Sequence, residues 1–132
     1  MMIIVMKRIL AMLIFSGSIL GSLMMLAGCK NDDPSVLKIF IRSDSNELLE
    51  GAQVVIVGDP ASNPPTNTYV DTLVTNASGY AEFNMDTYFN AAGEDNGTGY
   101  FDVIAKDNTK SGSAYVRCRV HLTTVETIFL MN

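Results

Sequence analysis

Apolar and polar side chains alternate in short runs along residues 36–131, and this alternation predicts β-strands. In residues 36–42, Leu37, Ile39 and Ile41 would face a core while the side chains between them face solvent. The same period of two predicts further strands at residues 51–58, 69–75, 80–84, 99–106, 114–122 and 125–131. Residues 29–132 contain no convincing helical period, so we expect an all-β domain.

Turn-forming residues separate these runs. Asn76-Ala77-Ser78-Gly79 is a turn in which Gly79 can take a positive φ, and residues 107–112 form a hairpin-like connection. Two connections are longer: residues 59–68 contain three prolines, and residues 85–98 are polar and irregular. About seven short strands joined in this way predict a single antiparallel, immunoglobulin-like sandwich, with binding expected in the two long loops.

The first 28 residues differ from the rest, because a long apolar run follows the basic pair Lys7-Arg8. The run ends in Leu26-Ala27-Gly28-Cys29, which resembles the lipobox of bacterial lipoproteins. The resemblance implies cleavage between Gly28 and Cys29, a diacylglyceryl group on the Cys29 sulfur and an acyl chain on its new amino group. The alternative is an uncleaved membrane anchor, since residues 9–27 are just long enough to span a bilayer.

This interpretation divides the chain into a helical signal peptide (1–28), a lipidated tether (29–35) and a β-sandwich domain (36–132). The tether begins Lys30-Asn31-Asp32-Asp33, which looks like the surface-export signal of bacteroidete lipoproteins. That resemblance implies an outer-membrane lipoprotein displayed on the cell surface. The alternative is a charged, solvated linker with no such role.

The balance of acidic and basic residues indicates which classes of partner to expect. Lys7 and Arg8 are two of the nine basic residues, so residues 29–132 carry seven basic and 14 acidic side chains. An acidic domain disfavours nucleic acid and anionic lipid as partners. Membrane attachment is therefore expected to come from the lipid on Cys29 alone.

Three segments are similar to the carboxypeptidase regulatory-like and transthyretin-like sandwich families. They are Glu50-Gly51-Ala52-Gln53-Val54-Val55-Ile56, Thr75-Asn76-Ala77-Ser78-Gly79-Tyr80-Ala81-Glu82-Phe83 and Tyr100-Phe101-Asp102-Val103-Ile104-Ala105. The chain departs from the family pattern where residues 85–98 replace a Gly-x-Tyr motif and where residues 59–68 are longer than usual. The resemblance implies a transthyretin-like fold and a non-catalytic domain rather than an enzyme.

Candidate chemistry is sparse. His121 is the single histidine, and Cys118 lies on the opposite face of the strand predicted at 114–122, which leaves no local Cys–His pair. If Cys29 carries lipid, Cys118 is an unpaired thiol, and its alternation with Val116 and Val120 predicts a buried position. We expect no metal and no cofactor.

The other face of that strand carries Tyr115, Arg117, Arg119 and His121, which could together receive carboxylates, sulfates or an acidic glycan. The alternative is a solvated strand face paired with acids such as Glu82 or Asp102 on neighbouring strands.

These observations favour a membrane-anchored, extracytoplasmic lipoprotein whose sandwich is a binding or structural module for a glycan or a protein. A second hypothesis is an envelope or fimbrial assembly component, in which residues 125–131 pair with another chain at a sheet edge. A third, a hydrolase, would require His121.

Overall fold

The computed structural model describes residues 28–93 and 96–132. The chain divides into two compact units, residues 1–31 and residues 32–132. The predicted signal helix, with Leu26 and Ala27 of the lipobox, lies outside the described residues. Among those described, no helix has the length and apolar character needed to cross a bilayer.

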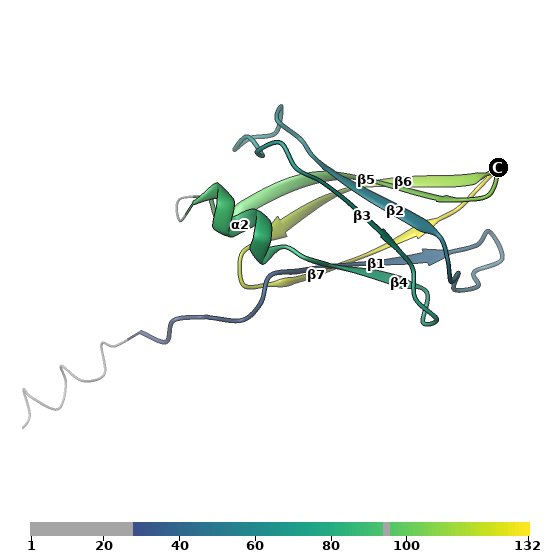
Figure 1. Ribbon diagram of the computed structural model, residues 1–132, viewed down its shortest axis with the longest axis horizontal. Coiled ribbons are helices and arrows are strands. Elements are labelled where there is room, and N and C mark those ends of the chain that lie inside the picture. Colours follow the sequence, from purple (N-terminus) through teal and green to yellow (C-terminus); the bar gives the residue numbers. More distant parts are fainter. Residues whose placement is uncertain (1–27, 94–95) are drawn as a thin grey trace, which may run out of the picture. The chain divides into compact units, whose positions relative to one another are not determined.

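The second unit is an all-β sandwich, as predicted (Figure 1). Its described part contains one helix, α2 (Asp86–Ala92), and seven strands. The strands overlap the seven predicted ranges, although β6 begins four residues and ends three residues earlier than predicted. They are β1 (Val36–Arg42), β2 (Gln53–Gly58), β3 (Val70–Val74), β4 (Tyr80–Asn84), β5 (Thr98–Asp107), β6 (Lys110–Arg119) and β7 (Thr123–Phe129).

The strands form two sheets, one of three strands in the order β4-β1-β7 and one of four in the order β3-β2-β5-β6. Most neighbouring strands are antiparallel, as predicted, but β1 and β7 are parallel, with Val36 opposite Thr123 and Arg42 opposite Phe129. The purely antiparallel expectation is therefore wrong for this pair. The first and last strands of a sandwich can lie side by side in parallel because the rest of the chain connects them.

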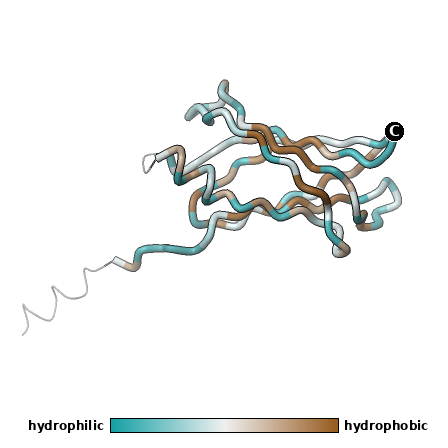
Figure 2. The backbone as a smooth tube through the Cα atoms, in the orientation of Figure 1, coloured by the Kyte–Doolittle hydropathy of each residue, from teal (hydrophilic) through white to brown (hydrophobic). Residues whose placement is uncertain are grey.

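The core lies between the sheets and contains the side chains that alternation assigned to it. Figure 2 shows apolar residues concentrated in the strands and polar ones in the connections. Completely buried strand side chains include Leu37, Ile39, Ile41, Val54, Ile56, Phe83, Phe101, Val103 and Ala105. Each large apolar side chain buried in this way stabilises the fold by ~1.5–3 kcal/mol.

Residues 85–98 are not the irregular loop that we predicted, because they contain α2. Met85, Tyr88 and Phe89 are buried and follow the i, i+3, i+4 spacing of one helical face. A helix of seven residues is too short for this spacing to stand out among polar neighbours. The segment therefore closes one end of the core.

The sandwich has two distinct ends. We call the end with α2 the helix end; it also contains residues 59–68, the β6–β7 turn and the start of β1. The other, the hairpin end, contains the β1–β2, β3–β4 and β5–β6 connections and the C-terminus (Figure 1). Both long connections singled out in the sequence thus lie at the helix end, where the Asn67 amide donates a hydrogen bond to the Tyr88 hydroxyl at 3.1 Å.

Candidate binding face and chain entry

The predicted stripe on residues 114–122 is only partly formed. Tyr115, Arg117 and Arg119 lie exposed on the outer face of β6, an edge strand of the four-stranded sheet. His121 does not join them, because β6 ends at Arg119 and His121 has a left-handed backbone with φ 60°. The same break leaves Leu122, the last residue of the predicted strand, 46% exposed. Side chains alternate between the two faces of a sheet only as far as the backbone of the strand stays paired with its neighbour.

His121 instead holds the segment through which the chain enters the sandwich. Its backbone amide donates to the Ser35 Oγ at 2.7 Å, and its Nδ1 lies 2.7 Å from the Asp33 carbonyl oxygen. The Ser35 amide donates to Asp86 Oδ1 at 2.9 Å, and the Met85 amide donates to the Ser35 carbonyl at 2.9 Å. We call Asp33, Ser35, Asp86 and His121 the clasp.

The clasp corrects the predicted boundary of the tether at residue 35. Ser35 is completely buried, so the folded domain already includes it. The hydrogen bonds from Ser35, with a smaller contribution from the charge of His121, hold the pKa of Asp86 below its ordinary value. The segment from Cys29 to the clasp is therefore very short.

Of the two acids considered as partners of the stripe, only Asp102 lies on a neighbouring strand of the same sheet. Glu82 lies in the three-stranded sheet and pairs with Lys38 at 3.4 Å, while Asp102 lies opposite Tyr115. Within residues 28–93 and 96–132, neither Arg117 nor Arg119 forms an ion pair. The stripe therefore consists of exposed side chains whose charges are left available.

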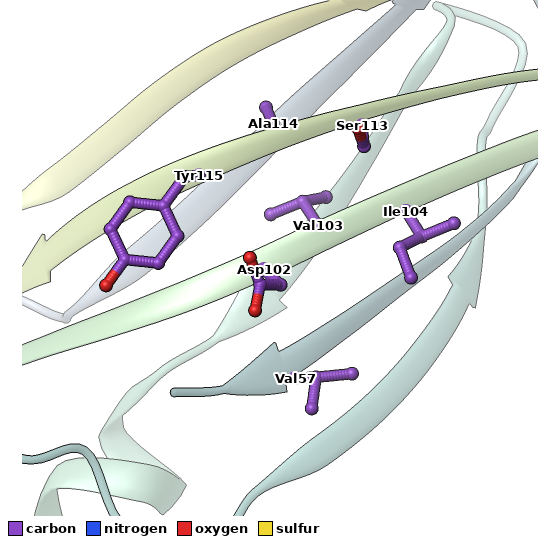
Figure 3. A pocket seen from close by; sticks show the side chains of 7 residues that line it. All are labelled: Val57, Asp102, Val103, Ile104, Ser113, Ala114 and Tyr115. Carbon is purple, nitrogen blue, oxygen red and sulfur yellow. The ribbon is translucent and has the colours of Figure 1, made fainter. Parts of the chain in front are cut away.

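Next to the stripe is a shallow hollow on the outer face of β2, β5 and β6 that the sequence analysis missed (Figure 3). Its volume is about 640 Å³, and its lining residues are Val57, Asp102, Val103, Ile104, Ser113, Ala114 and Tyr115. A signal was present in the sequence. The uninterrupted apolar run Val54-Val55-Ile56-Val57 implies a strand with apolar side chains on both faces, one of which must lie outside the core.

Tyr115 borders this hollow in a fixed position. Its hydroxyl donates to Asp59 Oδ2 at 2.7 Å, and its ring stacks on Tyr100 with centroids 6.0 Å apart and planes 18° apart. The hydrogen bond to Asp59 raises the pKa of Tyr115 to about 12. The side chain is nevertheless half exposed, so one part of the ring is held while another remains accessible.

Within the sandwich, the Cys118 thiol and the His121 imidazole do not lie together. Cys29 is exposed, whereas Cys118 is buried in the core, as predicted, and burial raises the pKa of its thiol to about 12. His121 lies in the clasp rather than beside Cys118. In the part of the chain that the structure describes, no group of three His, Cys, Asp or Glu side chains could hold a metal ion.

The predicted terminal strand is β7, at one edge of the three-stranded sheet. Beyond its end, Ser111 and Met131 exchange backbone hydrogen bonds at 3.1 Å and 3.0 Å. Part of this edge is thus used within the chain, and pairing with another chain stays a prediction.

Comparison with known proteins adds little. No family model and no curated protein matches the chain. Among solved structures, it is similar to the crystal structure of chlorocatechol 1,2-dioxygenase from Pseudomonas putida, with 13% identity and a TM-score of 0.41 over 81% of this chain. The chain spans 65% of the length of that protein. A likeness this remote carries no information about the activity of this chain.

Proposed function

We propose that this protein is a lipid-anchored, extracytoplasmic lipoprotein whose β-sandwich is a non-catalytic binding module held close to a bacterial outer membrane. The observation that carries the proposal is the short distance along the chain between the lipobox cysteine, Cys29, and the clasp that begins at Asp33.

Chain length limits how far the sandwich extends from its anchor. An extended chain covers at most ~3.3–3.6 Å per residue, so the segment from Cys29 to Asp33 spans no more than about 14 Å. Because the clasp lies at the helix end, a lipid on Cys29 keeps that end beside the bilayer. The hairpin end and the outer faces of both sheets are then the surfaces that a partner meets.

The lipid supplies retention, since the charge of the domain does not favour it. Each buried methylene contributes ~0.8 kcal/mol, and one acyl chain alone binds only marginally. A diacylglyceryl group together with an amide-linked chain makes dissociation negligible. Display on the cell surface, which the resemblance of Lys30-Asn31-Asp32-Asp33 to an export signal implies, is part of the same proposal.

A binding rather than catalytic role is supported by the positions of the reactive groups. A nucleophile requires a base within hydrogen-bonding distance, but the Cys118 thiol is buried with its pKa at about 12 and His121 Nδ1 contacts the Asp33 carbonyl. The exposed Tyr115, Arg117 and Arg119 are instead residue types that serve in recognition.

The anchor is tested by the intact mass of protein extracted from membranes with detergent. We expect the mass of residues 29–132 plus a diacylglyceryl group and one amide-linked acyl chain, for the natural chain and for the matched control Cys118→Ser. Cys29→Ser should remain unprocessed and keep residues 1–28. A natural chain that keeps these residues, or has an unmodified Cys29 sulfur, contradicts the proposal.

Orientation at the membrane is tested by energy transfer, because the chain contains no tryptophan and a single one can be introduced as a donor. Asn90→Trp on α2 and Ala77→Trp in the β3–β4 turn both replace exposed residues at opposite ends of the sandwich. In vesicles with dansyl-labelled lipid, transfer should be stronger from position 90 than from position 77. Equal transfer, or the reverse order, contradicts the proposed orientation.

A further inference from the structure

We infer that the hollow beside Tyr115 is a carbohydrate site that takes a neutral pyranose unit of a glycan. In this site the Tyr115 ring lies against the sugar, and the Asp102 carboxylate accepts hydrogen bonds from its hydroxyl groups. The inference goes beyond the proposed function and does not depend on the lipid anchor.

The first argument is the preorganisation of the aromatic ring. Tyr115 is held by Tyr100 on one side and by Asp59 through its hydroxyl, yet it is 52% exposed. A ring that is already immobile loses little side-chain entropy when a ligand binds. Such a ring offers an apolar surface to the C–H groups on one face of a pyranose.

The second argument concerns polar groups beside that ring. Asp102 is exposed directly opposite Tyr115, and within the described residues its carboxylate has no hydrogen-bond or ion-pair partner. Ser113, which lies two residues before Tyr115 on β6, contributes a hydroxyl that can donate or accept. A carboxylate accepts through both oxygens, which suits the neighbouring hydroxyl groups of a sugar.

The third argument is the composition and size of the hollow. Val57 and Ile104 provide apolar side chains on the side of Asp102 away from Tyr115, as the close-up shows (Figure 3). Small-ligand sites commonly have volumes of ~300–1,000 Å³, with mostly apolar walls and a few placed polar groups. The volume of about 640 Å³ lies within this range.

The charged side chains around the hollow favour a neutral sugar over an acidic one. Asp102 lines the hollow and Asp59 binds the Tyr115 hydroxyl, so an anionic group here would meet two carboxylates. Arg117 and Arg119 lie further along the strand, at ~7 Å and ~14 Å from Tyr115 for a rise of ~3.4 Å per residue. The site beside Tyr115 thus favours hydroxyl donors over the acidic ligand that the arginines alone suggest.

The experiment uses the full chain in a detergent without a sugar headgroup, titrated with maltohexaose, cellohexaose and mannohexaose, and with hexagalacturonate as the acidic counterpart. Calorimetry should detect at least one neutral hexasaccharide with a Kd between ~10 µM and ~1 mM. Tyr115→Ala and Asp102→Asn should each weaken that binding about tenfold or more, the loss expected for a contact with a charged or stacked group.

Three variants serve as controls. Tyr115→Phe keeps the ring and should bind within about threefold of the natural chain, since only the bond to Asp59 is lost. Arg119→Ala and Cys29→Ser should bind unchanged, and the latter separates this inference from the lipid anchor. Urea unfolding of each variant verifies that it is folded.

Four results would overturn the inference. They are no binding of any neutral hexasaccharide, binding that survives Tyr115→Ala, binding of hexagalacturonate alone with loss in Arg117→Ala, and a protein partner that occupies this face while the neutral sugars do not bind.

Discussion

At the helix end, hydrogen bonds of the clasp join residues far apart in the chain, whereas the hairpin end combines bonds within short turns with bonds from Thr75 to Leu49 and from Ala52 to Thr75, over 26 and 23 residues. At the helix end, the bond from Ser35 to Asp86 joins residues 51 positions apart, and that from His121 to Ser35 joins residues 86 apart. At the hairpin end, the Ser78 amide donates to Asn76 Oδ1, two residues away.

The widest of these separations along the chain is in the clasp. The helix end combines α2, the loop of residues 59–68 and the clasp into one closed region. Thr66 in that loop is buried and its Oγ1 accepts from the Tyr100 amide at 2.8 Å, so even the proline-rich connection is fixed. The end that we propose lies nearest the membrane is thus fixed by contacts between several elements of the fold.

The largest test of this difference is the loss of an aromatic side chain from α2. Tyr88 is buried. Its ring packs edge-on against the rings of Phe89, Phe101 and Tyr69, with ring centroids 5.1, 5.2 and 5.5 Å apart. Tyr88→Ala should lower the free energy of unfolding by about 3–5 kcal/mol, as for other large aromatic truncations in cores. Urea denaturation followed by circular dichroism measures this loss.

Two further variants are compared with Tyr88→Ala. Tyr88→Phe removes only the hydroxyl that accepts from the Asn67 amide and should cost about 0.5–1.5 kcal/mol. Tyr80→Ala, in the strand that follows the β3–β4 turn, removes a half-buried ring and should cost less than Tyr88→Ala. If Tyr80→Ala were the more damaging of the two, α2 would not close the core as argued.

A smaller effect is expected from the clasp. Ser35→Ala removes the oxygen that accepts from the His121 amide, and an unsatisfied buried donor costs about 1–3 kcal/mol. Ser78→Ala in the β3–β4 turn changes an exposed serine and should stay within about 0.5 kcal/mol of the natural chain. Equal midpoints in urea for these two serine variants would mean that the clasp adds no stability.

The same contrast explains how much could be predicted from the sequence. Strand positions and core faces follow from period-two alternation, as for Leu37, Ile39 and Ile41, and the positive φ of Gly79 follows from local turn chemistry. Both are properties of neighbouring residues. They were therefore accessible without any knowledge of the tertiary structure.

What the sequence analysis missed depends on residues that only the fold brings together. Nothing near His121 in the chain indicates that its partners are Asp33 and Ser35, so its place on a straight strand was the natural expectation. The hollow likewise requires β2, β5 and β6 to be neighbours. The local signals present were the spacing of Met85, Tyr88 and Phe89 for α2 and the apolar run 54–57 for the hollow.

Acid provides a way to weaken the clasp selectively. The pKa of Asp86 is below its ordinary value of 3.8 in the folded protein, because Ser35 donates hydrogen bonds to the ionised carboxylate. The stabilisation that the ionised Asp86 provides is fully present above the pKa of Asp86 in the unfolded state. It is lost as the pH falls through the lower pKa of Asp86 in the folded state. Urea midpoints measured from neutral pH to below 3.8 should therefore fall further for the natural chain than for Asp86→Asn. Parallel curves for the two proteins would exclude Asp86 from the acid response.

The smallest expected effect on stability comes from Tyr115, which links the loop of residues 59–68 to β6 through Asp59. Because the Asp59 carboxylate accepts a hydrogen bond from the phenol, the pKa of Tyr115 is raised from 10.0 to about 12. The neutral phenol is thus favoured in the folded protein, and its contribution is complete below pH 10.0 and lost as the pH rises through about 12.

Alkaline titration followed by tyrosinate absorbance tests this link, with Tyr115→Phe identifying the signal among the five tyrosines. Asp59→Asn should bring the pKa of Tyr115 down towards 10.0, with little change in the urea midpoint at neutral pH because the pair is exposed. Superimposable titrations would show that Asp59 does not hold the ring. The long-range hydrogen bonds of the helix end would then not extend to the hollow. The Tyr115 ring would become ordered only when a ligand binds.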